Sequence, residues 1–220
     1  MRRFLRNNGL GLVLFCLFVI FLAAQSITGW QVENEERTEH DEAPLAYAAY
    51  LHSGHFIEAT FENWESEYLQ MGAYVLLTVF LFQRGASDSK DPDNPEGDAS
   101  DPETDWQCPD IPWPMRHGGV VRTLYENSLS LVLLLLFAMA FVLHAIGGTS
   151  VANEERLAHG EAAETVWQFA RSSDFWFQSF QNWQSEFLSV FSLVVFSIWL
   201  RQRGSPESKP VTAPHHKTGG

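Results

Sequence analysis

The sequence predicts an all-α membrane protein with four transmembrane helices, arranged as two parallel helical-hairpin repeats about a pseudo-twofold axis. Three observations predict this fold class. The 220-residue chain repeats itself at a constant offset, its apolar residues gather in four blocks, and most of its basic residues fall on one side of those blocks. The 45% apolar content therefore comes from hydrophobic blocks that acidic, polar segments separate.

An internal repeat relates two large parts of the chain. Residues 3–90 align without a gap with residues 122–209 at an offset of 119, and 34 of the 88 pairs are identical. Average residue usage predicts only roughly 6% identity by chance. We therefore expect two copies of one shape, at 1–85 and 119–204.

The first apolar block of each copy is long enough to cross a membrane. Residues 9–28 and 128–147 each run without a charged residue, and about 20 such residues span ~30 Å of hydrocarbon. A cleaved signal peptide is the alternative for the first block, because basic residues precede it and Leu22-Ala23-Ala24 fits a cleavage site. The same pattern recurs in mid-chain, where no signal peptide operates, and this favours an uncleaved span.

The second span of each copy is predicted at about 63–82 and 182–200. The purely apolar runs are shorter, so these spans should begin near the motif Asn-Trp-x-Ser-Glu, at 63–67 and 182–186. Soluble core helices are the alternative. Their position in a repeat whose first block is a clear span favours the membrane.

The basic residues predict the orientation. Eleven of the 14 Lys and Arg lie in the N-terminal segment, the region between the copies and the C-terminal tail, and such residues mark the cytoplasmic side. We expect both termini in the cytoplasm and the loops 29–62 and 148–181 outside. Because each copy has two spans, both copies face the same way, which is the parallel kind of repeat.

The segments between the spans differ in character. Apolar residues recur at helical spacing at the ends of both outer loops, which predicts amphipathic helices near the outer interface, continuous with the second spans or separate from them. The linker 86–118 is acidic and rich in Pro, Ser and Gly, and it and the tail 205–220 are predicted to be disordered. The net charge of −13 argues against nucleic acid as a partner.

Two carboxylates are predicted to lie inside the membrane. Glu67 and Glu186 fall a few residues past the start of the second spans, where an ionised carboxylate is costly without a partner. Asn63 and Asn182 each lie four residues earlier, and therefore share a helix face with the carboxylate.

Two polar residues lie at a similar depth on the first spans, Gln25 and its counterpart His144. We predict that Glu67 pairs with Gln25 and Glu186 with His144, so that each hairpin is tied by a hydrogen bond. A proton or cation path along these carboxylates is one alternative, and simple exposure to solvent is the other.

A second constellation, Asn-Glu-Glu-Arg-x-x-His, occurs in both outer loops. Glu36 and His40 are four residues apart, as are Glu155 and His159. On a helix this spacing could offer a carboxylate and an imidazole to a metal, and two copies could supply four ligands. The alternative is a solvated helix whose glutamates favour its positive end.

The sequence supports no enzyme and implies no cofactor. It contains no Gly-rich phosphate loop, HExxH or GxSxG motif, and no hydroxyl nucleophile with a credible base. A structural or partner-binding role comes first, with the lipid bilayer and either another protein or a second copy as partners. A small channel or transporter using Glu67 and Glu186 is the alternative, and a metal-dependent membrane enzyme is the least favoured.

Four blocks in order resemble a family of small bacterial integral membrane proteins that is defined as a domain of unknown function. The blocks are Arg2-Arg3-Phe4-Leu5-Arg6-Asn7-Asn8-Gly9-Leu10, Asn34-Glu35-Glu36, Asn63-Trp64-Glu65-Ser66-Glu67-Tyr68-Leu69-Gln70 and Gln202-Arg203-Gly204-Ser205-Pro206-Glu207-Ser208-Lys209. The resemblance spans nearly the whole chain. It implies a bacterial inner-membrane location and supplies no activity, ligand or catalytic residue.

Overall fold

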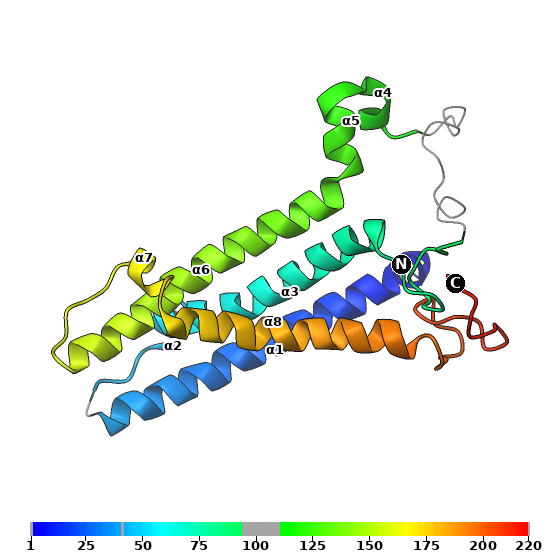
Figure 1. The fold of residues 1–220 in the computed structure, drawn as a ribbon. Helices are drawn as coiled ribbons and strands as arrows, with labels where there is room; N and C mark the ends of the chain where they lie inside the picture. The colour runs from blue at the N-terminus through cyan, green and yellow to red at the C-terminus, as the bar shows by residue number, and fades with distance from the viewer. Residues whose placement is uncertain (1, 41, 94–110, 220) are drawn as a thin grey trace. The chain divides into compact units, whose positions relative to one another are not determined.

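The computed structural model describes residues 2–40, 42–93 and 111–219, and all regular structure in this part of the chain is helical (Figure 1). The all-α prediction is confirmed. Residues 94–110 of the predicted disordered linker lie outside the described residues. In chain order the helices are α1 (Arg2–Glu39), α2 (Tyr47–Tyr50), α3 (Gly54–Phe80), α4 (Trp113–His117), α5 (Gly119–Glu126), α6 (Ser128–Ala158), α7 (Val166–Phe169) and α8 (Ser173–Phe196).

Among the described residues, two helices are long and apolar enough to cross a membrane. They are the Asn7–Glu39 part of α1 and the whole of α6, Ser128–Ala158. These two helices contain the predicted first spans, 9–28 and 128–147. The criterion is one of length and composition, and it identifies two spans where the sequence predicts four.

The predicted loop helix and the predicted second span of each half of the sequence repeat form one unbroken helix. α3 has 27 residues and α8 has 24, and neither contains a proline that would interrupt the backbone hydrogen bonds. The short helix α7 precedes α8 and begins with a capping box, in which Thr165 and Gln168 satisfy each other's backbone N–H groups. The amphipathic pattern of the loops therefore continues directly into α3 and α8.

The chain divides into two compact units. Unit 1 comprises Met1–Phe61 and Val142–Phe175, and unit 2 comprises Glu62–Phe141 and Trp176–Gly220. Each unit combines segments from both halves of the sequence repeat, and α3, α6 and α8 contribute residues to both units. The two units are described separately below.

Small residues allow close helix packing in unit 1. A Cβ placed on Gly147 of α6 would lie 2.5 Å from the backbone nitrogen of Glu58 in α3, and one on Gly54 would lie 2.5 Å from Cβ of Ser150. Glycine at such a contact lets two backbones approach more closely than any other residue would. The buried side chains of this unit include Tyr50, Phe169 and Phe175.

In unit 2, α3 packs against α6 and is joined to α8 by hydrogen bonds. Gly72 of α3 faces Leu133 and Leu134 of α6 at ordinary contact distance. The side chain of Asn182 on α8 donates to Glu62 on α3 over 2.6 Å. α6 and α8 also contact each other, since the rings of Phe137 and Trp183 lie 6.1 Å apart, so the three helices pack together in this unit.

Candidate functional site

The outer-loop motif forms the same hydrogen bonds at two places in unit 1. The Asn34 amide donates to the carbonyl of Leu45 and accepts from its N–H, over 3.2 and 2.6 Å. The Asn153 amide does the same with the backbone of Glu164, over 3.0 and 2.7 Å. Both residues of the second pair are 119 positions after those of the first. The asparagine thus connects the end of the long helix to the loop segment that follows it.

The arginine of this motif closes the same loop. Arg37 Nε donates to the carbonyl of Ala43 over 3.0 Å, and Arg156 Nε donates to that of Ala162 over 2.9 Å. Arg37 also forms a 2.9 Å ion pair with Glu42. These arginines hold the turn after each helix.

The four candidate metal ligands are not brought together. His40 Nδ1 lies 2.8 Å from the carbonyl of Glu36, and His159 Nδ1 lies 2.9 Å from that of Glu155. Because a carbonyl can only accept, Nδ1 carries the proton in both rings. Within the described residues, no group of three or more His, Cys, Asp or Glu side chains is arranged to hold a metal ion.

Among the described residues of unit 2, the buried carboxylate is Glu65, which is not one of the predicted site residues. Glu65 has 0% exposure and accepts a 3.1 Å hydrogen bond from Trp183 Nε1. The side chain of Glu67 is exposed instead. Two residues along a helix differ by about 200° in direction, so the burial of one leaves the other facing away. The signal that could have found Glu65 is its position one turn before the apolar run.

The remaining predicted contacts are divided between the units. Glu186 is half-buried, whereas Glu67 is exposed. Gln25 and His144 belong to unit 1, so the predicted pairs Glu67–Gln25 and Glu186–His144 would each join residues of different units and stay predictions. His144 is fully buried, with its ring 4.8 Å from that of Phe175.

Asn63 and Asn182, the two asparagines of the candidate set, differ in environment. Asn63 is exposed and Asn182 is half-buried, where it donates to Glu62. The two asparagine–carboxylate pairs predicted to share a helix face therefore differ: Asn63 and Glu67 are exposed, whereas Asn182 and Glu186 are half-buried. In the second copy the asparagine bonds across to α3 instead.

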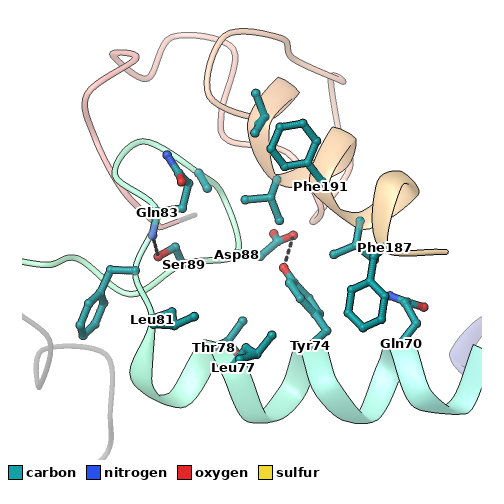
Figure 2. A pocket seen from close by; sticks show the side chains of 15 residues that line it. Gln70, Tyr74, Leu77, Thr78, Leu81, Gln83, Asp88, Ser89, Phe187 and Phe191 are labelled. Atoms are coloured by element: carbon teal, nitrogen blue, oxygen red, sulfur yellow. Dashed lines mark hydrogen bonds between the residues drawn. The ribbon is translucent and has the colours of Figure 1, made fainter. Parts of the chain in front are cut away.

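Unit 2 also contains a cavity of about 360 Å³ between α3, α8 and the segment that follows α3. Figure 2 shows its lining, with Tyr74 rising from α3 toward Asp88 and with Phe187 and Phe191 on α8. The Tyr74 hydroxyl donates to Asp88 over 3.5 Å. Most of the remaining lining residues are aliphatic, so the cavity is mainly apolar, and Asp88 is its one charged lining residue.

The tail packs around a buried lysine in unit 2. Lys209 has 1% exposure, and its ammonium donates to the carbonyls of Gly85, His215 and Lys217. Three acceptors match its three N–H donors. Burial lowers the pKa of Lys209, and the nearby Arg201 lowers it further, whereas the three carbonyls favour the charged form.

The composition of the tail does not predict this arrangement. The described residues from 205 onward form turns that hydrogen bonds join to the segment after α3, such as the one from the Gly85 N–H to the Thr218 hydroxyl. Ser87 likewise donates to the carbonyl of Glu207 over 3.0 Å. The predicted linker begins within this packed region.

One aromatic side chain stands out on the outer-loop surface of unit 1. Trp167 of α7 is 65% exposed. The guanidinium carbon of Arg171 lies 4.2 Å from the centre of its ring, which is the geometry of a cation–π contact. The corresponding residues of the first copy are Ala48 and His52, so this feature belongs to the second loop alone.

The sequence profile described as Domain of unknown function (DUF6766) matches residues 1–220. No curated protein and no solved structure is detectably similar to the chain.

Proposed function

The chain belongs to the DUF6766 family over its whole length, and on that premise we propose that it is a bacterial inner-membrane protein that acts by binding a partner. In this proposal four helices cross the membrane as two parallel hairpins, both termini lie in the cytoplasm, and the outer loops present the binding surface. The chain has no catalytic role in this proposal. The observation that carries it is the exposed Trp167–Arg171 pair on an otherwise well-tied loop.

Recurring contacts support the two-hairpin architecture. The asparagine and arginine bonds of the outer loops recur at an offset of 119, and so does a turn near the predicted inner boundary. There Gln83 N–H donates to the Ser89 hydroxyl, and Gln202 N–H donates to the Ser208 hydroxyl, both over 2.8 Å. Equal contacts at equal offsets are expected where two copies fold alike.

Helix length supports four crossings. At 1.5 Å per residue, the 27 residues of α3 and the 24 of α8 extend for about 40 and 36 Å, more than the ~30 Å of a hydrocarbon core. Both helices also carry exposed large apolar residues, including Phe80 and Leu188. Such faces suit lipid contact better than contact with water.

Cysteine labelling tests this topology. In a background with Cys16 and Cys108 replaced by Ser, single variants Thr38→Cys and Ser205→Cys would be treated with a membrane-impermeant maleimide in intact spheroplasts. The proposal expects labelling of the first and protection of the second until the cells are lysed. Equal labelling of both positions in intact spheroplasts would contradict the four-span orientation.

The residue types of the exposed pair favour a protein partner. Trp and Arg are the residues most enriched among those that dominate binding energy at protein interfaces. The stacked Arg171 holds the ring in place and reduces the entropy lost when a partner orders it. Lipid anchoring of Trp167 is the other role for an exposed ring, and the experiment below separates the two.

Photocrosslinking tests the surface. A photoreactive amino acid at Val166, which is exposed beside Trp167, would be activated in cells. We expect a protein adduct that disappears with Trp167→Ala and weakens with Arg171→Ala, while Trp199→Ala, which changes another exposed tryptophan, leaves it intact. Labelling of lipid alone, or an adduct insensitive to Trp167, would contradict the proposal.

A second candidate function is a proton or cation path. It is favoured by the position of Glu67 and Glu186 in the predicted second spans, where a carboxylate is costly without a cation or a proton. Flux in liposomes would be compared between wild type and the Glu67→Gln, Glu186→Gln double variant, with Glu161→Gln as a control. Flux lost only in the double variant supports transport, and no flux in any protein rejects it.

A metal-dependent enzyme is the third candidate. Its test is the metal content of the purified protein before and after His40→Ala and His159→Ala. A stoichiometric metal lost with the histidines would support it, and the local hydrogen bonds of both rings favour the opposite outcome.

A further inference from the structure

None of the functions proposed above involves the cavity of unit 2. Its long walls are aliphatic, with residues such as Leu77 of α3 and Val194 of α8. Its charged group is Asp88, which bonds to Tyr74 in the middle of the view, while the uncharged Gln70 and Gln83 lie at opposite ends of it (Figure 2). A predominantly apolar pocket with a few convergent polar groups is the usual form of a small-molecule site.

The charge of this cavity has one sign. Asp88 is half-buried, and within the described residues it has no ion pair; its hydrogen-bond partner is the Tyr74 hydroxyl. No described Lys or Arg side chain lines the cavity. A carboxylate in a partly apolar setting gains more from a cation than one in water does.

Aromatic rings surround the same space. Tyr74 and Phe82 contribute from the α3 side, and Phe187 and Phe191 from α8. The face of an aromatic ring carries negative charge density and attracts ammonium groups that have left water. The rings and the carboxylate together therefore favour ligands that are both positively charged and apolar.

We propose that this cavity is a binding site for a small hydrophobic organic cation, a quaternary or protonated amine that carries one aromatic or short aliphatic group. A volume of about 360 Å³ is near the lower end for ligand pockets, roughly 300–1,000 Å³, and is too small for a phospholipid. The ammonium lies against Asp88 and Tyr74, and the apolar group lies between Leu77 and Val194. The proposal does not depend on Trp167, which belongs to unit 1.

The test compares two ligands of similar shape and opposite charge. The full-length protein in phosphatidylcholine nanodiscs would be titrated with benzyltrimethylammonium and with benzylsulfonate, and saturable binding followed by ligand-observed NMR. We expect the dissociation constant of the cation to be lower by roughly tenfold or more, the ratio that one favourable charge contact produces. Equal affinities, or tighter binding of the anion, would overturn the proposal.

Variants assign the preference to the cavity. Asp88→Asn should bring the two dissociation constants close together, Asp88→Glu should retain the difference, and Asp91→Asn removes a nearby charge that does not line the cavity and should change nothing. Loss of the preference in Asp91→Asn to the same degree would mean that only net charge matters. Cation preference that survives Asp88→Asn would also overturn the proposal.

Two further variants keep the test decisive if Asp88→Asn does not fold. Val194→Trp fills the cavity and should abolish saturable cation binding, while Phe187→Leu removes one ring and should weaken it by roughly two- to fivefold. Circular dichroism would establish that each variant retains its helices. Full cation binding in a folded Val194→Trp protein would place the ligand elsewhere and reject the site.

Discussion

Trp183 donates its indole N–H to Glu65, so that a carboxylate with 0% exposure is held between α3 and α8. One turn before Glu65 on α3, Glu62 accepts a hydrogen bond of 2.6 Å from the side chain of Asn182. The α3–α8 pair of unit 2 is thus fastened by acidic groups of one helix and by donors of the other.

This relationship makes Glu65, and not Glu67, the sensitive carboxylate of the motif. Glu65→Leu should lower the free energy of unfolding by about 1–3 kcal/mol, because it removes the acceptor of the Trp183 N–H. Glu65→Gln keeps a carbonyl acceptor and should cost less. Glu67→Gln, at an exposed position, should change stability by less than ~0.5 kcal/mol.

Thermal or SDS-induced unfolding in detergent, followed by circular dichroism, measures these differences. A larger effect at Glu67 than at Glu65 would contradict the arrangement of α3 against α8. The same three variants can be assayed in liposomes, because the transport hypothesis depends on Glu67 while the structural contact depends on Glu65.

Two glycines should be intolerant of alanine because an aromatic side chain covers each of them. A Cβ on Gly148 would lie 2.5 Å from the ring of Phe169, and one on Gly29 would collide with the hydroxyl of Tyr50. Gly29→Ala and Gly148→Ala should each destabilise the protein by about 1–3 kcal/mol.

Gly11 provides the matched control. It lies on α1 as Gly29 does, and a Cβ there has no neighbouring heavy atom within 4 Å. Gly11→Ala should be neutral or stabilising by up to about 1 kcal/mol, because alanine favours a helix more than glycine does. Equal losses at Gly11 and Gly29 would indicate that helix flexibility, and not contact with Tyr50, decides the effect.

The asparagines of the outer loops should contribute equally. Asn34→Ala and Asn153→Ala each remove two hydrogen bonds to the backbone, and each should cost about 2 kcal/mol at roughly 1 kcal/mol per bond. Asn8→Ala, which loses one exposed bond to the carbonyl of Phe4, is the control and should cost less. Unfolding measurements that find a cost at one loop only would argue against two copies of the same shape.

The sequence predicts much of this fold because length and apolar periodicity are local properties. The blocks at 9–28 and 128–147 lie within α1 and α6. The apolar residues at helical spacing at the ends of the two loops, which include Phe56 and Phe175, lie within α3 and α8. The offset of 119 also anticipates matching contacts. These features depend on residues near one another in the chain, which a single sequence displays.

The site was harder to predict because it depends on which way each helix faces. Glu65 and Glu67 have the same chemistry and differ only in rotation about α3, which contacts with Trp183 decide. The cavity depends on Asp88, a residue of a segment that composition assigned to a disordered linker. Composition measures how much apolar surface a segment can bury, and it does not detect hydrogen bonds to backbone carbonyls such as those of Lys209.

Tyr50 should make the stability of unit 1 sensitive to alkaline pH. Burial raises the pKa of its phenol, and the nearby carboxylate of Glu33 raises it further. Because the folded pKa lies above the unfolded value of about 10, the contribution of Tyr50 is fully present below pH 10 and is lost as pH rises through the folded pKa. Tyr50→Phe should remove this part of the pH dependence.

The measurement is the unfolding midpoint from neutral pH to beyond pH 10, for wild type and Tyr50→Phe, with the tyrosinate absorbance recorded in parallel. Tyr47→Phe is the control, since its hydroxyl is bonded to Ser26 and its side chain is more exposed. Identical alkaline slopes for wild type and Tyr50→Phe would show that other groups control the transition.

Lys209 should decide whether the C-terminal tail stays packed. Lys209→Met preserves the apolar stem but leaves the carbonyls of Gly85, His215 and Lys217 without their shared donor. Each buried acceptor left unpaired costs about 1–3 kcal/mol, so the tail should detach before the helices unfold. Hydrogen exchange of residues 205–219 should therefore accelerate in this variant while exchange in α3 and α8 is unchanged.

The control is Lys90→Met, which replaces the lysine at the corresponding position of the first copy. Lys90 is only half-buried, so this change should have a smaller effect on the tail. Fast exchange of the tail already in the wild-type protein would contradict the packed arrangement and support the disorder that its composition predicts.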